Sequence, residues 1–154
     1  MPSAELSHKK CLRLLKSSVY GRLALCGSDQ QPYITPVIYV LFENKIYIHT
    51  GFQGRKIDCL RSNPKICFEI SSAGKLYAGP RAKDFSIRYW CVLVFGQAQE
   101  LSDHSFKLNV MNLFMEKYAA GYNYEALDLN DMQDVNVIEV TMEKISGKVG
   151  FDPK

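Results

Sequence analysis

The chain has 154 residues, of which 47% are apolar and 12% aromatic, and a chain of this size and composition can fill one sizeable hydrophobic core. These values exclude a disordered chain and predict a single globular domain over residues 1–154. Lys and Arg number 19 against 16 Asp and Glu, and the resulting formal charge of +3 is too small for a general nucleic-acid binder.

Two apolar stretches, residues 37–42 and 89–95, are the longest in the chain, and both are far shorter than the roughly 18 to 20 residues of a membrane-spanning helix. Residues 1–10 are not followed by the apolar segment of a secretory signal. We therefore expect a cytoplasmic protein whose partners include neither a membrane nor a nucleic acid.

The cysteines are odd in number and none belongs to a Cys-x-x-Cys pair: Cys11, Cys26, Cys59, Cys67 and Cys91. All except Cys26 are embedded in periodic apolar segments, which predicts free, buried thiols. The histidines are scattered along the chain and share no ligand-like interval with the cysteines, so we predict no metal site.

The first predicted element is an amphipathic helix over residues 6–19. Its apolar residues recur near helical spacing, and its basic residues lie on the other face. Ser7 is placed to cap the first turn.

The next segments change to the composition and period of strands, over residues 20–26, 33–42 and 45–50. Tight turns separate these strands. The turn at Glu43-Asn44 is too short for the crossover that parallel strands need, so it predicts an antiparallel hairpin.

Residues 54–63 predict a short helix that ends before Pro64, and residues 65–71 predict a strand. Residues 73–84 contain glycines, a proline and charges, which predicts a loop or a frayed hairpin tip. Residues 86–101 form one long strand or two, with apolar side chains on both faces. One of those faces needs a partner beyond the core of its own chain.

Residues 103–118 predict a helix and residues 135–145 a closing strand, while residues 119–134 show no usable periodicity. About six strands with short hairpin turns, and helices beside them, favour a mainly β (α+β) fold. We expect an antiparallel barrel with flanking helices and not a doubly wound sheet.

The segment from His49 to Lys56 has the most specific chemical content. A strand ends, a glycine-bounded loop turns, and Arg55-Lys56 open the following helix. Helix N-terminal amides beside two cations form a site for a dianionic phosphate, and hence for a phosphorylated cofactor. A solvated basic pair in a surface loop explains the same residues equally well.

Two other residues allow two interpretations each. His49 ends an alternating strand and shares a face with Tyr47, which also suits a half-buried histidine bonded to backbone. Arg22 lies in an apolar strand, opposite in phase to Leu23 and Leu25, so it either points to solvent or meets an anion. The signatures of hydrolases, kinases and Rossmann proteins are missing, and catalytic residues stay unassigned.

Six segments, taken in their order along the chain, resemble the flavin-nucleotide-binding proteins related to pyridoxamine 5′-phosphate oxidase. Among these proteins, they resemble the branch of the 5-nitroimidazole resistance proteins in particular. These segments are Gly21-Arg22-Leu23-Ala24-Leu25, Pro32-Tyr33-Ile34-Thr35-Pro36-Val37, Ile46-Tyr47-Ile48-His49-Thr50, Gly54-Arg55-Lys56, Asn63-Pro64 with Cys67-Phe68-Glu69, and Val92-Leu93-Val94-Phe95-Gly96. The resemblance implies a split antiparallel β-barrel that forms a homodimer with FMN between the subunits.

The resemblance also implies roles for individual residues. Arg55 and Lys56, which follow Gly54, match the pair that holds the FMN phosphate, and Arg22 matches an arginine near that phosphate. His49 and Thr50 match the strand end that borders the flavin. Pyridoxamine phosphate oxidases bind their substrate with an arginine and a histidine that have no counterpart in this sequence. Cys91 stands where many relatives have serine.

The function implied by the resemblance is that of an FMN-dependent oxidoreductase acting on a small molecule, similar to a nitroimidazole reductase or related to pyridoxamine phosphate oxidase. The alternative is a flavin or haem carrier or sensor without catalytic turnover. In that alternative, His49 would be the axial ligand if haem is bound.

Overall fold

A computed structural model describes residues 3–150 of the chain. Its strands are β1 (Ser3–Glu5), β2 (Tyr20–Cys26), β3 (Pro32–Ile38), β4 (Val40–Phe42), β5 (Lys45–Thr50), β6 (Lys65–Tyr77), β7 (Ser86–Glu100) and β8 (Asn136–Gly150). Its helices are α1 (His8–Ser17), α2 (Arg55–Ser62) and α3 (His104–Tyr118), with short 3-10 turns at Ala82–Asp84 and Asp131–Gln133.

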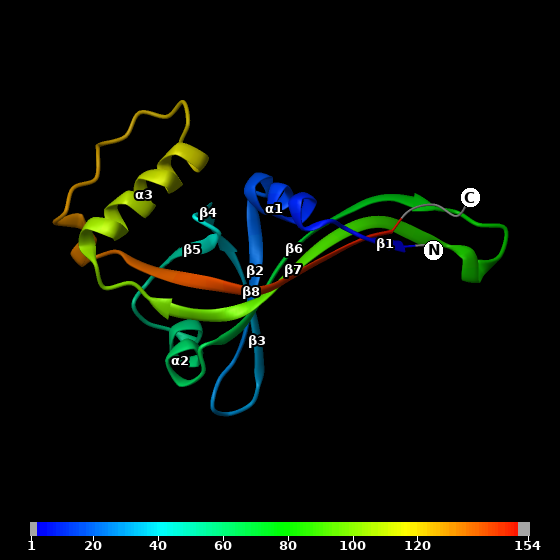
Figure 1. Ribbon diagram of the computed structural model, residues 1–154, viewed down its shortest axis with the longest axis horizontal. Helices are drawn as coiled ribbons and strands as arrows, with labels where there is room; N and C mark the ends of the chain where they lie inside the picture. The colour runs from blue at the N-terminus through cyan, green and yellow to red at the C-terminus, as the bar shows by residue number, and fades with distance from the viewer. Residues whose placement is uncertain (1–2, 151–154) are drawn as a thin grey trace.

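The strands form one antiparallel sheet in the order β3-β2-β6-β7-β8-β5-β4, and β1 adds to β8. This sheet curls around the core, with α1 and α2 on opposite sides of it and α3 at one end (Figure 1). The fold is therefore a split antiparallel β-barrel with flanking helices, which confirms the fold class predicted from the sequence.

Several elements confirm their predicted bounds to within one or two residues. Ser7 Oγ accepts a hydrogen bond from the Lys10 amide at 3.3 Å and caps α1, and Asp103 caps α3. Strands β2 and β5 have the predicted bounds. Glu43 and Asn44 have φ values of 47° and 59°, the left-handed geometry of a two-residue hairpin turn, and β4 pairs with β5 in antiparallel fashion.

The chain bends at Tyr39, which separates β3 from β4 inside the predicted single strand 33–42. Tyr39 is fully buried, and its hydroxyl donates a hydrogen bond to the Leu15 carbonyl at 2.6 Å. Its backbone amide donates to the Tyr118 hydroxyl at 3.0 Å, and its carbonyl accepts from Lys117 Nζ at 2.9 Å. Because side chains satisfy these backbone groups, β3 can pair with β2 while β4 pairs with β5.

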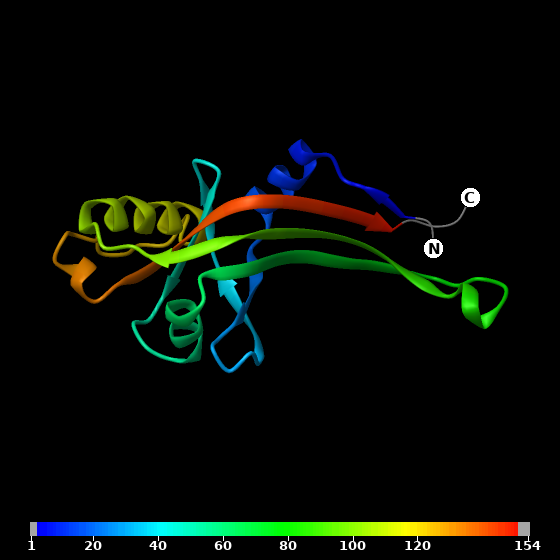
Figure 2. The ribbon, with the colours of Figure 1, turned by 60° about the horizontal axis from the view of Figure 1, so that its bottom comes forward.

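The hairpin of β6 and β7 is longer than the sequence predicted. Of the two interpretations of residues 73–84, the hairpin tip is confirmed and the loop is wrong for residues 73–77, because β6 continues to Tyr77, which pairs with Ser86. An irregularity in the register between Ala73 and Leu76 accommodates Gly74 without ending the strand. The hairpin projects beyond the barrel as an arm (Figure 2). Strand β8 likewise extends past residue 145 to Gly150.

Two hydrophobic clusters hold the fold together. The larger one fills the barrel and includes Leu15 from α1, Ile57 from α2 and Phe68 from β6, all with no exposed surface. The second lies between α3 and the sheet, where Val110 and Phe114 pack against Tyr47. Burial of these apolar side chains is the main favourable contribution to folding.

Residues 119–134 are irregular apart from one 3-10 turn, as their lack of periodicity predicted. Lys107 of α3 anchors the end of this segment. Its side chain is only 3% exposed, and its ammonium group donates to the carbonyls of Met132 at 2.7 Å and Val135 at 3.0 Å. A buried ammonium needs such acceptors to offset the loss of its hydration.

All five cysteines are free, but they are not all buried. Cys11 and Cys59 are buried as predicted, whereas Cys67 and Cys91 are only half-buried, which corrects the prediction for these two. They lie on the outer face of the sheet, where Cys67 pairs with the exposed Phe95. Within residues 3–150, no His, Cys, Asp or Glu residues form a metal-binding group, and no helix could span a membrane.

The close approach of β8 to Gly96 gives the first prediction. A Cβ atom at Gly96 would lie 2.0 Å from the Thr141 carbonyl oxygen, whereas one at Gly51 would meet nothing within 4 Å. We expect Gly96→Ala to lower the free energy of unfolding by roughly 1 to 3 kcal/mol or more, because backbone atoms must move. Gly51→Ala should leave it nearly unchanged. Urea unfolding of both variants tests this, and equal stabilities would contradict the packing argument.

Candidate functional site

The loop between β5 and α2 leads into the basic pair, Arg55 and Lys56, at the start of α2. Residues 51–54 form this loop, and Gly54 has a φ of 107°, which strongly favours glycine. Gly54 is the N-cap of α2 and provides no capping side chain, so the amides of Arg55 and Lys56 have none, while the Ile57 amide donates to the Gly54 carbonyl at 2.9 Å. Buried Ile57 and Leu60 hold the helix on the barrel. Arg55 is exposed and Lys56 half-buried at its start.

A polar network that sequence reasoning missed ties this loop to the barrel. The Asn136 side-chain amide donates to the Gly51 carbonyl at 3.2 Å and to Glu100 Oε1 at 2.8 Å. Arg61 of α2 makes two hydrogen bonds to the Glu100 carboxylate, at 2.7 and 2.9 Å. These contacts, Arg61 foremost, hold the pKa of Glu100 below its ordinary value. The network therefore connects the end of β7 and the start of β8 to the first residue of the loop and to the last turn of α2.

Arg55 has a surface counter-ion. Its Nη2 lies 3.2 Å from Asp29 Oδ2, in the turn between β2 and β3, and its guanidinium lies 5.6 Å from the centre of the Tyr33 ring. Both members of the ion pair are about half exposed, and such pairs contribute little free energy. A phosphate group could therefore compete with Asp29 for Arg55 at small cost.

Lys56 has no carboxylate partner among residues 3–150. Burial lowers the pKa of its ammonium group, since removal from water disfavours the charged form. An anion bound beside it would offset this effect. The start of α2 therefore combines an unpaired cation, a weakly paired arginine and free amides, which is the donor set of a phosphate site.

His49 and Thr50 end β5 beside this basic pair. The His49 ring is exposed, and its centre lies 6.3 Å from that of Phe114. Within residues 3–150 the ring makes no hydrogen bond, so the interpretation of a histidine bonded to backbone is wrong. Although His49 is exposed, its ring faces Phe114 and loses part of its hydration there, which lowers the pKa of His49, and the positive charge of Lys56 lowers it further.

Arg22 lies on the outer face of the sheet, and both interpretations of it are partly right. Its Nη1 lies 2.8 Å from Glu69 Oε2, its Nη2 bonds the Tyr20 hydroxyl at 3.3 Å, and its side chain is still 38% exposed. The structure joins Arg22 to no residue of the β5–α2 loop within residues 3–150. The single chain thus brings together His49, Thr50 and the Gly54-Arg55-Lys56 turn, with Arg22 apart.

An apolar row crosses the outer face beside Arg22. Register pairing aligns Ile34 of β3, Ala24 of β2, Cys67 of β6 and Phe95 of β7. Ile34 is 60% exposed and Phe95 43% exposed. The sequence predicted apolar groups on both faces of β7, and the structure confirms this, with the alternate residues of that strand buried in the barrel.

A hollow lies beside Arg55, and its lining includes none of His49, Thr50, Gly54 and Lys56. The hollow beside Arg55 has a volume of about 260 Å³ and includes the carboxylates of Asp29 and Asp58. Ligand pockets usually enclose about 300 to 1,000 Å³. The hollow beside Arg55 is therefore smaller than a usual ligand pocket.

Comparison with known proteins places this geometry in context. An uncharacterised protein of Rhizobium meliloti (strain 1021) is 36% identical over 97 residues, which are 62% of this chain. The chain therefore spans only 56% of the length of that relative. This relative assigns no function.

Solved structures share the fold. A Bacteroides thetaiotaomicron protein named for 5-nitroimidazole antibiotic resistance superposes with a TM-score of 0.82 at 19% identity, over 96% of this chain and 87% of that chain. A FAD and haem binding protein from Mycobacterium smegmatis superposes with a TM-score of 0.79 at 14% identity, over 100% and 77% of the two chains. At these identities the likeness establishes the split barrel.

The sequence also matches the family model described as pyridoxamine 5′-phosphate oxidase, over residues 7–149. That match covers nearly all of the chain and includes the strands, the β5–α2 loop and the outer face described above. The chain belongs to the pyridoxamine 5′-phosphate oxidase family.

Proposed function

We propose that the protein binds FMN and uses it as an oxidoreductase on a small molecule. The unpaired Lys56 beside Arg55 at the uncapped start of α2 is the observation that carries this proposal. FMN ends in a phosphate monoester whose two charges match these two cations. Membership of the family and the likeness to a flavin-binding split barrel support the same cofactor.

Each residue of the site has a definite task in this proposal. Arg55 exchanges Asp29 for the phosphate, Lys56 neutralises the second charge, and the amide groups after Gly54 donate to phosphate oxygens. His49 and Thr50 border the ring system from the end of β5. The flavin supplies the hydride or electron transfer when bound, so no acid or base of the protein is obligatory.

We further propose a homodimer with FMN between the subunits. The apolar row on the outer face exposes large side chains that a second copy would cover, and the hollow beside Arg55 needs another wall. In such a dimer Arg22, on the same outer face, approaches the cofactor phosphate as the family resemblance implies. The free cysteines agree with a cytoplasmic protein.

The phosphate anchor is tested by Arg55→Ala and Lys56→Ala. Charge-assisted hydrogen bonds contribute roughly 1.5 to 3 kcal/mol each, and about 1.4 kcal/mol is tenfold in affinity. Each variant should therefore bind FMN roughly tenfold to a hundredfold more weakly, while riboflavin, which lacks the phosphate, binds as before. Flavin fluorescence titration measures both ligands.

Lys65→Ala is the matched control for the anchor, because Lys65 is an exposed lysine at the start of β6. It should bind FMN like the unchanged protein. Full FMN affinity in both anchor variants, or an equal loss of FMN and riboflavin, would show that the pair does not hold the phosphate.

The dimer is tested by placing a charge in the apolar row. Phe95→Lys should produce a monomer and reduce flavin binding, because an ammonium group cannot be buried there without a partner. Leu129→Lys changes a leucine that is 51% exposed in the irregular segment and should leave the dimer intact. Sedimentation measures the mass, and a flavin-loaded monomer of unchanged sequence would contradict the shared site.

A second candidate function is that of a flavin or haem carrier or sensor without turnover. The exposed His49 ring, free of hydrogen bonds within residues 3–150, favours it, since an axial ligand must offer a neutral imidazole nitrogen. Absorption spectra and a nicotinamide oxidation assay separate the functions. Flavin bands with oxidation support the enzyme, flavin bands without oxidation support the carrier, and a Soret band that His49→Ala abolishes supports haem.

The electrostatics of His49 give a further prediction. The pKa of His49 should lie below its ordinary value of 6.5, so acidification through that value protonates the unfolded chain first and destabilises the fold. Lys56→Gln should raise the pKa of His49 only in part, because burial, the larger cause, persists. NMR titration of the His49 ring measures this, and an unchanged pKa in the variant would show that Lys56 exerts no field there.

A further inference from the structure

A groove lies between α1 and the β4–β5 hairpin, on the side of the barrel away from α2 (Figures 1 and 2). Its volume is about 560 Å³, which is within the range of ligand pockets, roughly 300 to 1,000 Å³. The residues that line it are Ser7, Lys9, Lys10, Leu12, Arg13, Lys16, Leu41 and Asn44. None of them belongs to the proposed flavin site.

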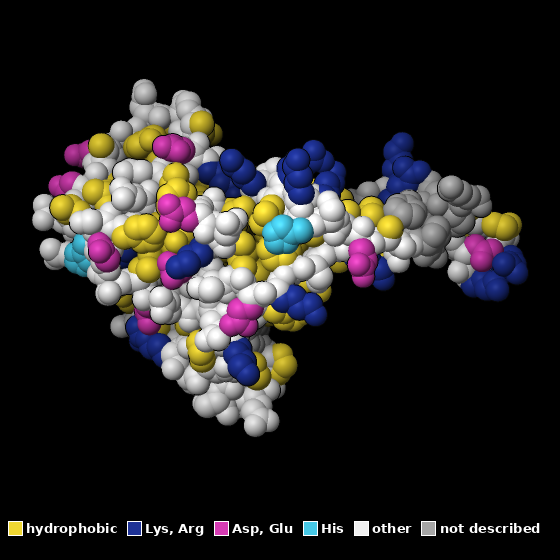
Figure 3. Space-filling model, in the orientation of Figure 1, with side chains coloured by type: hydrophobic (Ala, Val, Ile, Leu, Met, Phe, Trp, Pro, Cys, Tyr) yellow, Lys and Arg dark blue, Asp and Glu magenta, His cyan; other side chains and the backbone are white. Residues whose placement is uncertain are grey.

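Positive charge is concentrated in this groove. Helix α1 contributes Lys9, Lys10, Arg13 and Lys16, and the lining contains no acidic residue. Within residues 3–150 none of these four cations forms a salt bridge. Figure 3 shows the cluster of basic side chains over α1. An unpaired cluster of this kind attracts an anion that carries several charges.

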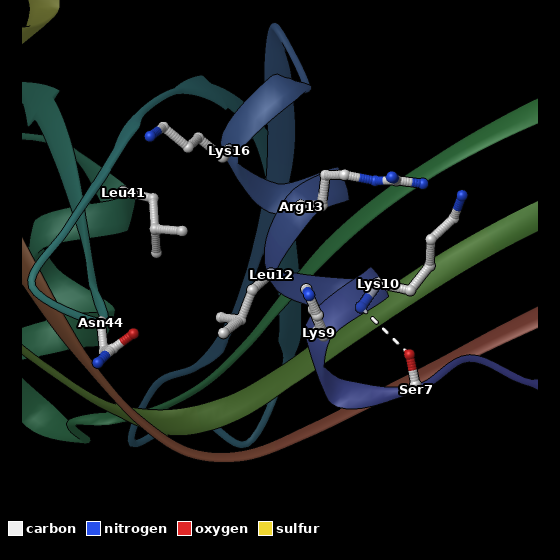
Figure 4. Close-up of a pocket in the computed structure, with 8 residues that line it drawn as sticks. All are labelled: Ser7, Lys9, Lys10, Leu12, Arg13, Lys16, Leu41 and Asn44. Atoms are coloured by element: carbon white, nitrogen blue, oxygen red, sulfur yellow. Dashed lines mark hydrogen bonds between the residues drawn. The ribbon is translucent and has the colours of Figure 1, made fainter.

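The groove also has an apolar wall. Figure 4 shows Lys16 reaching from the last turn of α1 toward the hairpin that carries Leu41 and Asn44. Leu12 lies on the helix side of the groove, and the side chains of Lys10 and Arg13 point away from the hairpin. Both leucines are half-buried, so they offer partly covered apolar surface to a ligand. The Asn44 side chain can donate and accept hydrogen bonds at the far end.

The packing of α1 argues for a small ligand and against a membrane surface. Cys11 and Leu15, the most buried residues of the helix, belong to the barrel core. A helix that lies on a membrane must instead present its apolar face to the lipid. The apolar part of the site is confined to the groove between α1 and the hairpin.

We propose that this groove binds an organic phosphate of nucleotide size. The phosphate groups lie among the α1 cations, and the apolar body of the ligand covers Leu12 and Leu41. This second anion site does not depend on the flavin function, because α1 and α2 lie on opposite sides of the barrel.

The proposal is tested by calorimetric titration of ATP into the FMN-saturated protein at low ionic strength, where screening is weak. We expect saturable binding of one ATP per chain, no binding of adenosine, and weaker binding of inorganic pyrophosphate, which lacks the apolar body. The double variant Lys9→Gln, Lys16→Gln should bind ATP about tenfold or more weakly. Glutamine keeps good helix propensity, so α1 should remain intact.

Two controls make the result specific. Lys65→Gln with Lys83→Gln removes the same charge from exposed positions on β6 and the arm and should leave ATP affinity unchanged. Arg55→Gln should also leave it unchanged, whether or not the protein binds flavin. Loss of ATP binding in Arg55→Gln would place the ATP at the start of α2 and overturn the proposal.

Other outcomes also contradict the proposal. Equal weakening by the two double variants would indicate a general charge effect, and equal affinity for pyrophosphate and ATP would show that the leucines contribute nothing. A lipid headgroup would be the ligand if the protein failed to bind ATP but sedimented with vesicles that contain phosphatidylglycerol. The protein would then not sediment with vesicles of phosphatidylcholine alone. Failure to bind ATP at millimolar concentration would remove the proposal altogether.

Discussion

The hydrogen bonds around Tyr39 are the constraint on which the rest of the barrel depends. One residue links α1 through the Leu15 carbonyl and α3 through Tyr118 and Lys117. Its burial raises the pKa of the Tyr39 phenol, and burial of the Lys117 ammonium lowers the pKa of that group to about 8. Because the backbone at Tyr39 is satisfied by side chains, the chain can leave β2 and pair anew with β5, which curls the sheet.

The change from pairing with β2 to pairing with β5 determines where Arg55 and Lys56 lie. Strand β5 pairs with β8 along its whole length, so its end at Thr50 lies beside Asn136. Asn136 then holds Gly51, and through Glu100 it also reaches Arg61 near the end of α2. The loop is fixed by these contacts at its start and by the helix at its end, which holds its backbone in one conformation.

The sequence alone predicted those elements whose signals are local. The bounds of β2 and β5 follow from alternation, and α2 from its glycine start and the proline after it. The break at Tyr39 was missed because it depends on Tyr118, 79 residues away. The Asn136 network, with partners 85 and 36 residues away, has no local pattern either. The glycines of the arm left a loop and a hairpin tip as alternatives, because the extent of the pairing with β7 has no local pattern.

Arg22 and Arg55 meet their carboxylate partners in different surroundings. Each guanidinium already has a carboxylate, Glu69 or Asp29, so neither is bare in water. The pair at Arg55 is exposed on both sides, whereas Glu69 is only 22% exposed and faces an apolar row. A second copy that covers this row would take the Arg22 pair out of water, which increases the attraction between its charges but costs their hydration. Arg55, which stays near water, can exchange its partner. The same residue type thus suits a fixed contact on the outer face and an exchangeable one at the helix start.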